Sequence, residues 1–292
     1  MAAASGVSPP ANVYSTRALH LRRLLRGRLT AYVIVCGAAA AAVAGAYLQR
    51  PVIMLAGPVV LAIVVLAASF AFATRDAEED FFRGFARGHG FDYLGRMELL
   101  PLTPLLGAGD RRHFEHYMEG HAGEERLPCG FGRYVYEELH RGRDADDAAR
   151  RSERHAFTVC VFDLERGIRL FPGIFLMRRR GLLGSLGGEH WLSRHGRHGV
   201  ELESIDLATR YELLVEDSQD EVALRRLFAP SFVVWLATHP LVPCFEYRGG
   251  TLVVYLEREL GDAGNLNLLL GAAGQIATRL AREIDEQALT AA

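Results

Sequence analysis

The sequence contains no lysine, since all 33 of its basic residues are arginine. This absence excludes chemistries that depend on a lysine amine: the phosphate-binding P-loop, the pyridoxal-phosphate Schiff base, the strand lysine of protein kinases and Ser-x-x-Lys catalysis. Cysteine is scarce too, and the four cysteines show no paired spacing that would indicate a disulfide framework or a zinc site. We expect Cys129, in a loop-like context, to be a structural thiol.

Charge is almost absent from residues 29–73, where Arg50 is the single charged residue. The two uncharged runs, 29–48 and 52–73, are each long enough as helices to cross a hydrocarbon core of about 30 Å. Their three-residue link allows only a tight turn. The sequence therefore predicts a transmembrane helical hairpin, typical of an integral membrane protein; the alternative is a secretory signal peptide.

The flanking charges predict the topology of this hairpin. Residues 1–28 hold five arginines and no acidic residue, so the positive-inside rule places this basic tail, and hence both termini, in the cytoplasm. The composition suits a bacterial genome rich in G and C. We therefore expect a multi-pass protein of the bacterial cytoplasmic (inner) membrane with most of its chain in the cytoplasm. Gly37, Ala41 and Gly45 put small residues on one face of the first span, which we expect to pack on the second span rather than on another chain.

Residues 76–292 have the composition of a globular domain, with 26 arginines against 35 acidic residues and a formal charge of −9. An acidic domain argues against nucleic-acid binding. Its pattern predicts an α+β cytoplasmic domain, an antiparallel sheet with flanking helices. We expect strands at 114–119, 132–139, 156–164, 168–176, 200–203, 211–215, 244–247 and 251–256, and helices at about 74–90, 218–238 (interrupted by Pro230) and 265–287.

One stretch of this domain, residues 200–236 (VELESIDLATRYELLVEDSQDEVALRRLFAPSFVVWL), resembles a signature of a known family. The family is an uncharacterised group of bacterial two-span membrane proteins with a C-terminal cytoplasmic domain of unknown function. The resemblance implies a fold and a topology but no chemistry. The matching residues are Leu202, Glu203, Ser204, Tyr211, Leu213, Asp217, Arg225, Pro230, Phe232 and Leu236, with Gly90-Phe91 and Gly109-Asp110 upstream, whereas Leu224 and Ala229 depart from the pattern.

A locally basic strip is the strongest candidate site in the sequence. We define the arginine strip as Arg178, Arg179, Arg180, Arg194 and Arg197. Arginine forks bind phosphate groups well, so the strip is a candidate contact for anionic lipid headgroups or an acidic partner. The alternative is a solvated loop, or arginines paired with acidic residues of the same domain.

Other clusters give no cofactor, metal or catalytic assignment. His113 and His116 have odd spacing on one predicted strand and should point to opposite faces, away from a common metal ion. The glycine-rich residues 181–188 lack the spacing of a dinucleotide-binding loop. Glu201 and Glu203 share a predicted strand face, which suggests an acid/base pair or, more simply, the solvent-exposed face of an amphipathic strand.

These observations favour a membrane-anchored cytoplasmic binding or scaffold domain that contacts a protein partner or anionic lipid. One alternative is an enzyme at the inner leaflet whose residues are too scattered to form a local motif. The other is an accessory subunit of a membrane complex.

Overall fold

The computed structural model describes residues 12–13, 18, 51–140, 151–179 and 192–290. The chain divides into two compact units. The first comprises residues 1–88 with 261–263, and the second comprises residues 89–260 with 264–292.

The main element of the first unit is α3 (Pro51–His89), a helix of 39 residues. Val59 and Ile63, in its first half, are exposed, whereas Phe81 and Phe82, in its second half, are buried. In the same unit, the Val13 amide donates a hydrogen bond of 2.9 Å to the Gly261 carbonyl.

The predicted transmembrane hairpin is wrong for the described part of the chain, in which no helix combines the length and the apolarity needed to cross a bilayer. The uncharged run 52–73 is helical but does not form a separate helix. It is part of α3, which continues without interruption through the charged residues Arg75, Asp76 and Glu78 to His89. The integral-membrane assignment that depended on the hairpin is corrected with it. Residues 29–48, including Gly37, Ala41 and Gly45, lie outside the described residues, and the cytoplasmic location stays a prediction.

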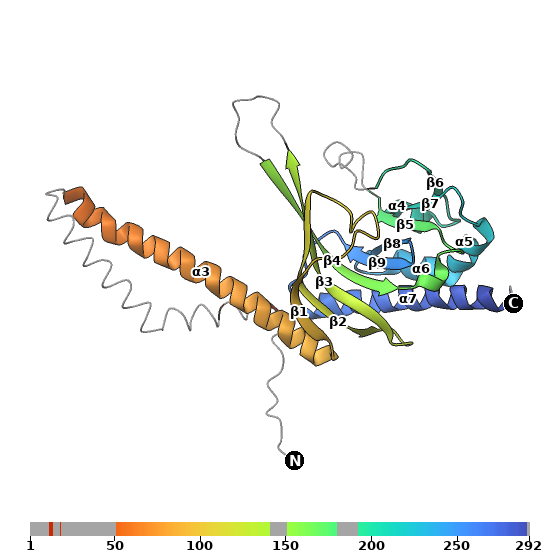
Figure 1. Cartoon of the computed structure of the whole chain (residues 1–292), viewed down its shortest axis with the longest axis horizontal. Helices are drawn as coiled ribbons and strands as arrows, with labels where there is room; N and C mark the ends of the chain where they lie inside the picture. The colour runs from red at the N-terminus through yellow and green to blue at the C-terminus, as the bar shows by residue number, and fades with distance from the viewer. Residues whose placement is uncertain (1–11, 14–17, 19–50, 141–150, 180–191, 291–292) are drawn as a thin grey trace, which may run out of the picture. The chain divides into compact units, whose positions relative to one another are not determined.

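The second unit is built on a nine-stranded sheet whose order is β1-β2-β3-β4-β9-β8-β5-β7-β6 (Figure 1). Every neighbouring pair is antiparallel. The strands are β1 (Asp92–Met97), β2 (Arg111–Ala122), β3 (Leu127–His140), β4 (Arg151–Asp163), β5 (Gly173–Arg178), β6 (Arg197–Val200), β7 (Tyr211–Glu216), β8 (Cys244–Arg248) and β9 (Thr251–Leu256).

Local signals in the sequence explain the central hairpin. All six residues of β9 are buried, consistent with its apolar, β-branched sequence. The turn between β8 and β9 places Gly249 and Gly250 at φ +58° and +84°, a backbone region that glycine enters without a Cβ penalty. The predicted hairpin is present at the expected residues.

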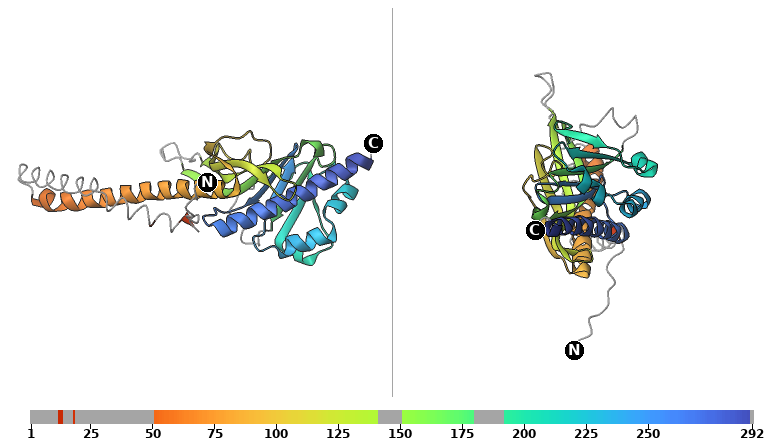
Figure 2. Two further views of the ribbon diagram at one scale, coloured as in Figure 1. Left: turned by 90° about the horizontal axis from the view of Figure 1, so that it is seen from below. Right: turned by 90° about the vertical axis from the view of Figure 1, so that its right-hand side faces the viewer.

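Helices cover one face of the sheet. The long helix α7 (Ala263–Thr290) runs along this face, which we call the helix face (Figure 2). It approaches the β2–β3 turn so closely that a Cβ on Gly274 would lie 2.5 Å from the Gly123 amide nitrogen. The remaining short helices are η1 (Glu165–Gly167), α4 (Ile205–Arg210), α5 (Glu221–Leu227) and α6 (Pro230–Thr238).

The predicted interruption at Pro230 is confirmed, because Pro230 begins α6 and separates it from α5. The helix begins at Glu221, later than the expected residue 218, and it is capped by the Asp220 carboxylate, which accepts a hydrogen bond of 2.7 Å from the Val222 amide. Three elements, β1, η1 and α4, were not predicted, and β6 shares only Val200 with the strand expected at 200–203.

A single row of directly opposed residues crosses the whole sheet, and we call it the central row. Directly opposed residues on neighbouring strands point to the same face, here the face opposite α7, which we call the groove face. The row runs Asp92, Glu119, Gly130, Val161, Val253, Glu246, Phe175, Leu214 and Gly199, from β1 to β6.

Candidate functional site: an acidic groove

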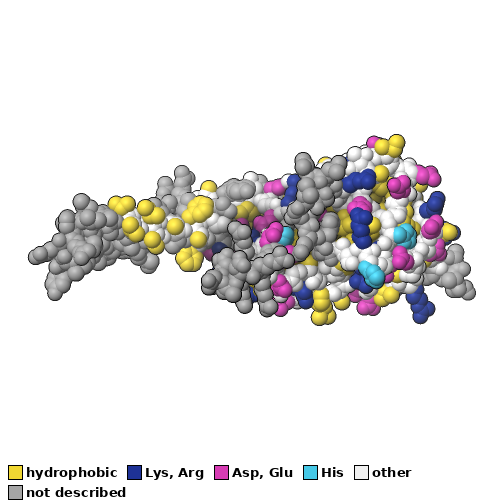
Figure 3. Space-filling model, turned by 90° about the horizontal axis from the view of Figure 1, so that it is seen from above, with side chains coloured by type: hydrophobic (Ala, Val, Ile, Leu, Met, Phe, Trp, Pro, Cys, Tyr) yellow, Lys and Arg dark blue, Asp and Glu magenta, His cyan; other side chains and the backbone are white. Residues whose placement is uncertain are grey.

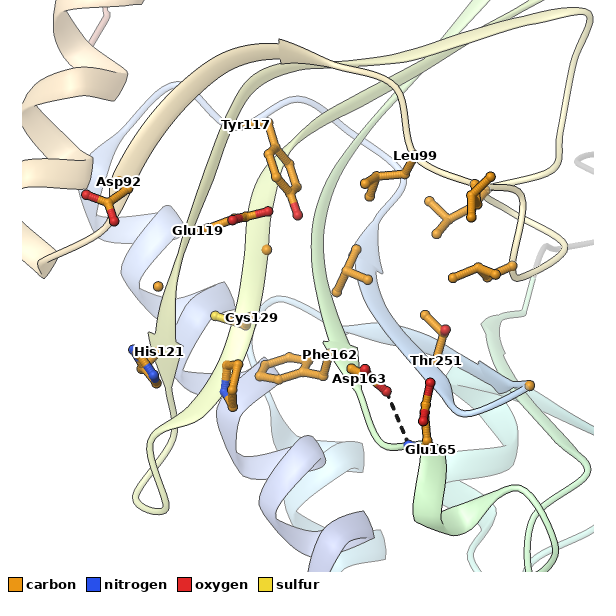
Figure 4. Close-up of a pocket in the computed structure, with 18 of the residues that line it drawn as sticks. Asp92, Leu99, Tyr117, Glu119, His121, Cys129, Phe162, Asp163, Glu165 and Thr251 are labelled. Carbon is orange, nitrogen blue, oxygen red and sulfur yellow. Dashed lines mark hydrogen bonds between the residues drawn. The ribbon is translucent and has the colours of Figure 1, made fainter.

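The groove face contains a cavity of about 670 Å³ at the β1 end of the central row, which we call the groove (Figure 4). Its lining comes from β1, β2, β3, β4, β9, the β8–β9 turn, η1 and the segment between β1 and β2. The lining residues are Gly90, Asp92, Leu99, Leu100, Leu102, Leu106, Tyr117, Glu119, Gly120, His121, Pro128, Cys129, Gly130, Val161, Phe162, Asp163, Glu165, Gly249 and Thr251.

Four leucines form one wall of the groove: Leu99, Leu100, Leu102 and Leu106. Leu106 is buried, whereas Leu100 and Leu102 are 71% and 51% exposed. The wall belongs to residues 98–110, which pass over the groove face and make a helical turn where the Gly107 amide donates to the Thr103 carbonyl at 2.9 Å. Exposed leucines beside a cavity are apolar surface available to a ligand.

Glu246, in the middle of the central row, anchors this wall to the sheet. Its side chain is 2% exposed, and its Oε1 accepts a hydrogen bond of 2.9 Å from the Leu105 amide. Burial raises the pKa of Glu246 to about 7, although the neighbouring Thr103 hydroxyl, the Leu105 amide and the guanidinium groups of Arg197 and Arg248 all lower it. A buried carboxyl group thus holds the turn that presents the leucines.

The groove floor depends on glycine. Tyr117 lies across β3, where a Cβ on Gly130 would overlap the tyrosine hydroxyl and one on Gly132 would lie 3.0 Å from its Cα. A bulge in β2 shifts the pairing register between Glu115 and Met118, with His116 at φ +52°. Such a bulge changes the direction of the neighbouring side chain. The neighbouring side chain here is Tyr117, which points into the groove (Figure 4).

Four exposed carboxylates lie around the groove, two on each side (Figure 4). Asp92 and Glu119 are opposed on β1 and β2. Across the floor, Asp163 ends β4 and its Oδ1 accepts a 3.2 Å hydrogen bond from the backbone amide of Glu165. Within the described residues no ion pair involves any of the four, and no arginine lines the groove. Among the described lining residues, His121 is the one with a basic side chain.

The nucleophilic side chains of the groove are held in their protonated forms. Burial raises the pKa of the Cys129 thiol to about 12, so the reactive thiolate is not formed at neutral pH. Burial, and then the adjacent Glu119 carboxylate, also raises the pKa of Tyr117. The arrangement suits binding better than nucleophilic chemistry, and the expected structural role of Cys129 fits its burial.

The arginine strip lies towards the β6 end of the sheet. Arg178 and Arg179 are exposed, and Arg179 donates a hydrogen bond of 2.6 Å to the Ala208 carbonyl. The Arg194 guanidinium lies 2.5 Å from the Glu212 carboxylate. Arg180 lies outside the described residues.

The last member of the strip, Arg197, is directed onto the sheet. Its guanidinium donates to the Ser193 carbonyl and lies 4.6 Å above the centroid of the Phe175 ring, a cation–π arrangement. Its opposed residue on β7 is Glu216, which pairs with Arg248 at 3.2 Å. On the face shown in Figure 3, basic and acidic side chains are interspersed. At Arg194 the alternative of pairing within the domain is the one observed, because its guanidinium contacts Glu212.

The remaining clusters do not assemble. His113 contacts Glu115 at 3.3 Å, whereas His116 Nδ1 and the Tyr93 hydroxyl are 2.9 Å apart. No group of metal-ligating side chains occurs among the described residues. Glu201 and Glu203 are exposed and follow β6 instead of sharing a strand. Residues 181–188 lie outside the described residues.

The groove and its anchor Glu246 were not predicted from the sequence. Glu246 had a usable signal, since it is the one acidic residue in the apolar strand Cys244–Tyr247, and isolated buried carboxyl groups often mark functional sites. The four groove carboxylates had none, because they come from separate segments that only the sheet register brings together.

The chain matches no protein-family model, no curated protein and no solved structure. The family resemblance over residues 200–236 therefore stays a prediction, and the groove is the feature of the molecule that bears on function.

Proposed function

We propose that this protein is a non-enzymatic binding domain whose groove holds a short apolar segment of a protein partner. The observation that carries the proposal is the groove of about 670 Å³ with the exposed Leu100 and Leu102 along its wall. Ligand sites are typically concave, largely apolar and of this size, with a few polar groups that orient the ligand.

The side chains of the groove support binding over catalysis. The Cys129 thiol is protonated because burial raises its pKa to about 12. Tyr117 is protonated for the same reason. A nucleophile needs a lowered pKa or an adjacent base, and both groups are shifted in the opposite direction.

The shape and charge of the groove favour a protein segment over an anionic lipid. Its lining extends over five neighbouring strands, β1-β2-β3-β4-β9, which span roughly 19 Å at about 4.8 Å per interval. That length suits an extended segment of about six residues at roughly 3.3 Å each. Phosphate headgroups would be repelled by four carboxylates.

The proposal is tested by panning random heptapeptides on phage against the full-length chain and measuring the affinity of the enriched peptides by fluorescence polarisation. We expect Leu100→Ser together with Leu102→Ser to weaken binding at least tenfold, because burying each leucine against the peptide contributes about 1 kcal/mol to the free energy of binding. The matched control is Ile205→Ser with Val222→Ser, two exposed apolar residues outside the groove. Enrichment of no peptide, or equal binding to both double variants, would refute the proposal.

A further inference from the structure

The geometry points to a basic partner segment, in which two cationic side chains flank an apolar centre. This inference rests on the proposed function and specifies the ligand of the same groove. It is carried by the distribution of charge around the leucine wall.

Among the described residues, the groove carboxylates lack ion-pair partners, unlike Glu115 and Glu212 on the same sheet. Elsewhere, Glu115 contacts Arg133 and Arg154 at 3.4 and 3.2 Å, and Glu212 contacts Arg194 at 2.5 Å. Within the described residues, no such pair is formed by Glu119 or Asp163 in the groove. The negative charge is therefore uncompensated at the place where a ligand can enter. A ligand with positive charge would be complementary to it.

The position of the carboxylates sets the spacing of the ligand charges. Asp92 and Glu119 lie on β1 and β2, whereas Asp163 lies on β4 and Glu165 follows it. One strand, β3, separates the two pairs and contributes only Gly130 to the central row. Since β2 and β4 are two strand intervals apart, about 10 Å, an extended ligand would place its cationic residues roughly three positions apart.

The two kinds of contact have separate roles. The leucine wall supplies apolar contact, which favours any segment with leucine-like side chains. The four groove carboxylates select the charge of the segment and accelerate its association, because exposed charges mainly affect the association rate and the specificity of binding. A ligand with the required chemistry is a protein segment with Arg or Lys on each side of two apolar residues.

The test uses three fluorescein-labelled hexapeptides with a central Leu-Leu pair flanked on both sides by Arg, by Gln or by Glu. We expect the affinity for the full-length chain to fall in the order Arg, Gln, Glu. Raising the salt from about 0.05 to 0.5 M should weaken the Arg peptide severalfold and leave the Gln peptide unchanged, because salt screens exposed charges.

Charge variants of the protein complete the test. Glu119→Gln with Asp163→Asn should weaken the Arg peptide about threefold to tenfold, from two exposed charge contacts, and leave the Gln peptide unaffected. Glu203→Gln with Asp206→Asn neutralises two exposed carboxylates outside the groove and should change neither peptide. Thermal unfolding monitors the fold of each variant.

Three outcomes would contradict one of the two proposals. Equal affinity for the Arg and Gln peptides overturns the basic-segment inference and leaves the binding function standing. Displacement of the Arg peptide by spermidine at equal concentration also overturns it, because a polyamine would not need the leucine wall. Failure of all three peptides to bind, together with failed panning, removes the proposed function itself.

Discussion

The two ends of the groove face differ in the sign of the charges discussed above and in whether these charges have partners within the domain. At the β1 end, Glu119 and Asp163 lie beside an apolar cavity without ion-pair partners among the described residues. At the β6 end, Arg194 contacts Glu212 at 2.5 Å and Arg197 covers the Phe175 ring. Arg194 and Arg197 are therefore held by contacts within their own domain, whereas the groove carboxylates are available to a ligand.

The comparison shows that a charged stretch of sequence is not the same as a charged surface. The arginine strip was conspicuous because its members are close together in the sequence, yet Glu212 and Glu216 on the adjacent β7 lie against it. The groove acids were inconspicuous because they are scattered in sequence and converge only through strand pairing. Local net charge has to be counted on the folded sheet.

The largest effect should come from Glu246, the residue of the central row that lies between the two ends. Its pKa is raised from an ordinary 4.5 to about 7, so the folded state holds the proton more tightly than the unfolded state. The stability contributed by the protonated carboxyl group is complete below about pH 4.5 and is lost as the pH rises to about 7. The difference amounts to roughly 3 kcal/mol.

We therefore expect Glu246→Gln to be more stable than the parent at pH 7.5 and to have a flatter stability profile between pH 4.5 and 7.5. The glutamine amide oxygen can still accept the hydrogen bond from Leu105. Urea unfolding at a series of pH values measures the difference between the two proteins, and titrating histidines cancel in the comparison. Parallel profiles would show that Glu246 is ionised in the folded protein at no cost.

Much of the fold could be predicted because its signals are local. The β8–β9 hairpin followed from Gly249-Gly250, the division between α5 and α6 followed from Pro230, and α7 followed from its apolar period. The extent of α3 could not be predicted from the distribution of charged residues. A helix is formed by hydrogen bonds of the backbone, and these continue through charged and uncharged residues alike.

The site was harder to predict, for a physical reason. The central row requires the correct register at eight strand pairs, and the register shifts within two of them, β1–β2 and, at the bulge that contains His116, β2–β3. A slip of one residue in β2 would send Glu119 to the helix face and remove its charge from the groove. Glu246 alone could be identified from the sequence, because a carboxyl group inside an apolar strand is costly wherever that strand is buried.

A second prediction compares two glycines of the central row, one from each end. A Cβ on Gly130 would overlap the Tyr117 hydroxyl and approach its ring at 2.7–2.8 Å, whereas a Cβ on Gly199 would have its nearest neighbour, Leu214, at 3.9 Å. Overpacking typically costs about 1–3 kcal/mol. We expect Gly130→Ala to lower the free energy of unfolding by that amount and Gly199→Ala to leave it within about 0.5 kcal/mol of the parent.

Urea unfolding of the two alanine variants checks this prediction, and binding of an enriched heptapeptide gives a second measurement. The displaced Tyr117 ring should narrow the groove and weaken the peptide in Gly130→Ala, with no change in Gly199→Ala. Equal stability of the two variants would mean that Tyr117 does not lie across β3.

The smallest effects should differ in sign between the two ends. Neutralising Arg194 to Gln removes an exposed ion pair and should lower the stability by about 0.5 kcal/mol. Neutralising Glu119 to Gln removes one of several neighbouring negative charges, so the stability should rise slightly or stay unchanged. A double-mutant cycle of Arg194→Gln with Glu212→Gln should give a coupling energy of a few tenths of a kcal/mol, and a cycle of Glu119→Gln with Asp163→Asn a coupling of opposite sign. The same sign in both cycles would mean that the groove carboxylates are compensated like those beside the arginine strip, and the groove would then hold no free negative charge for a cationic ligand.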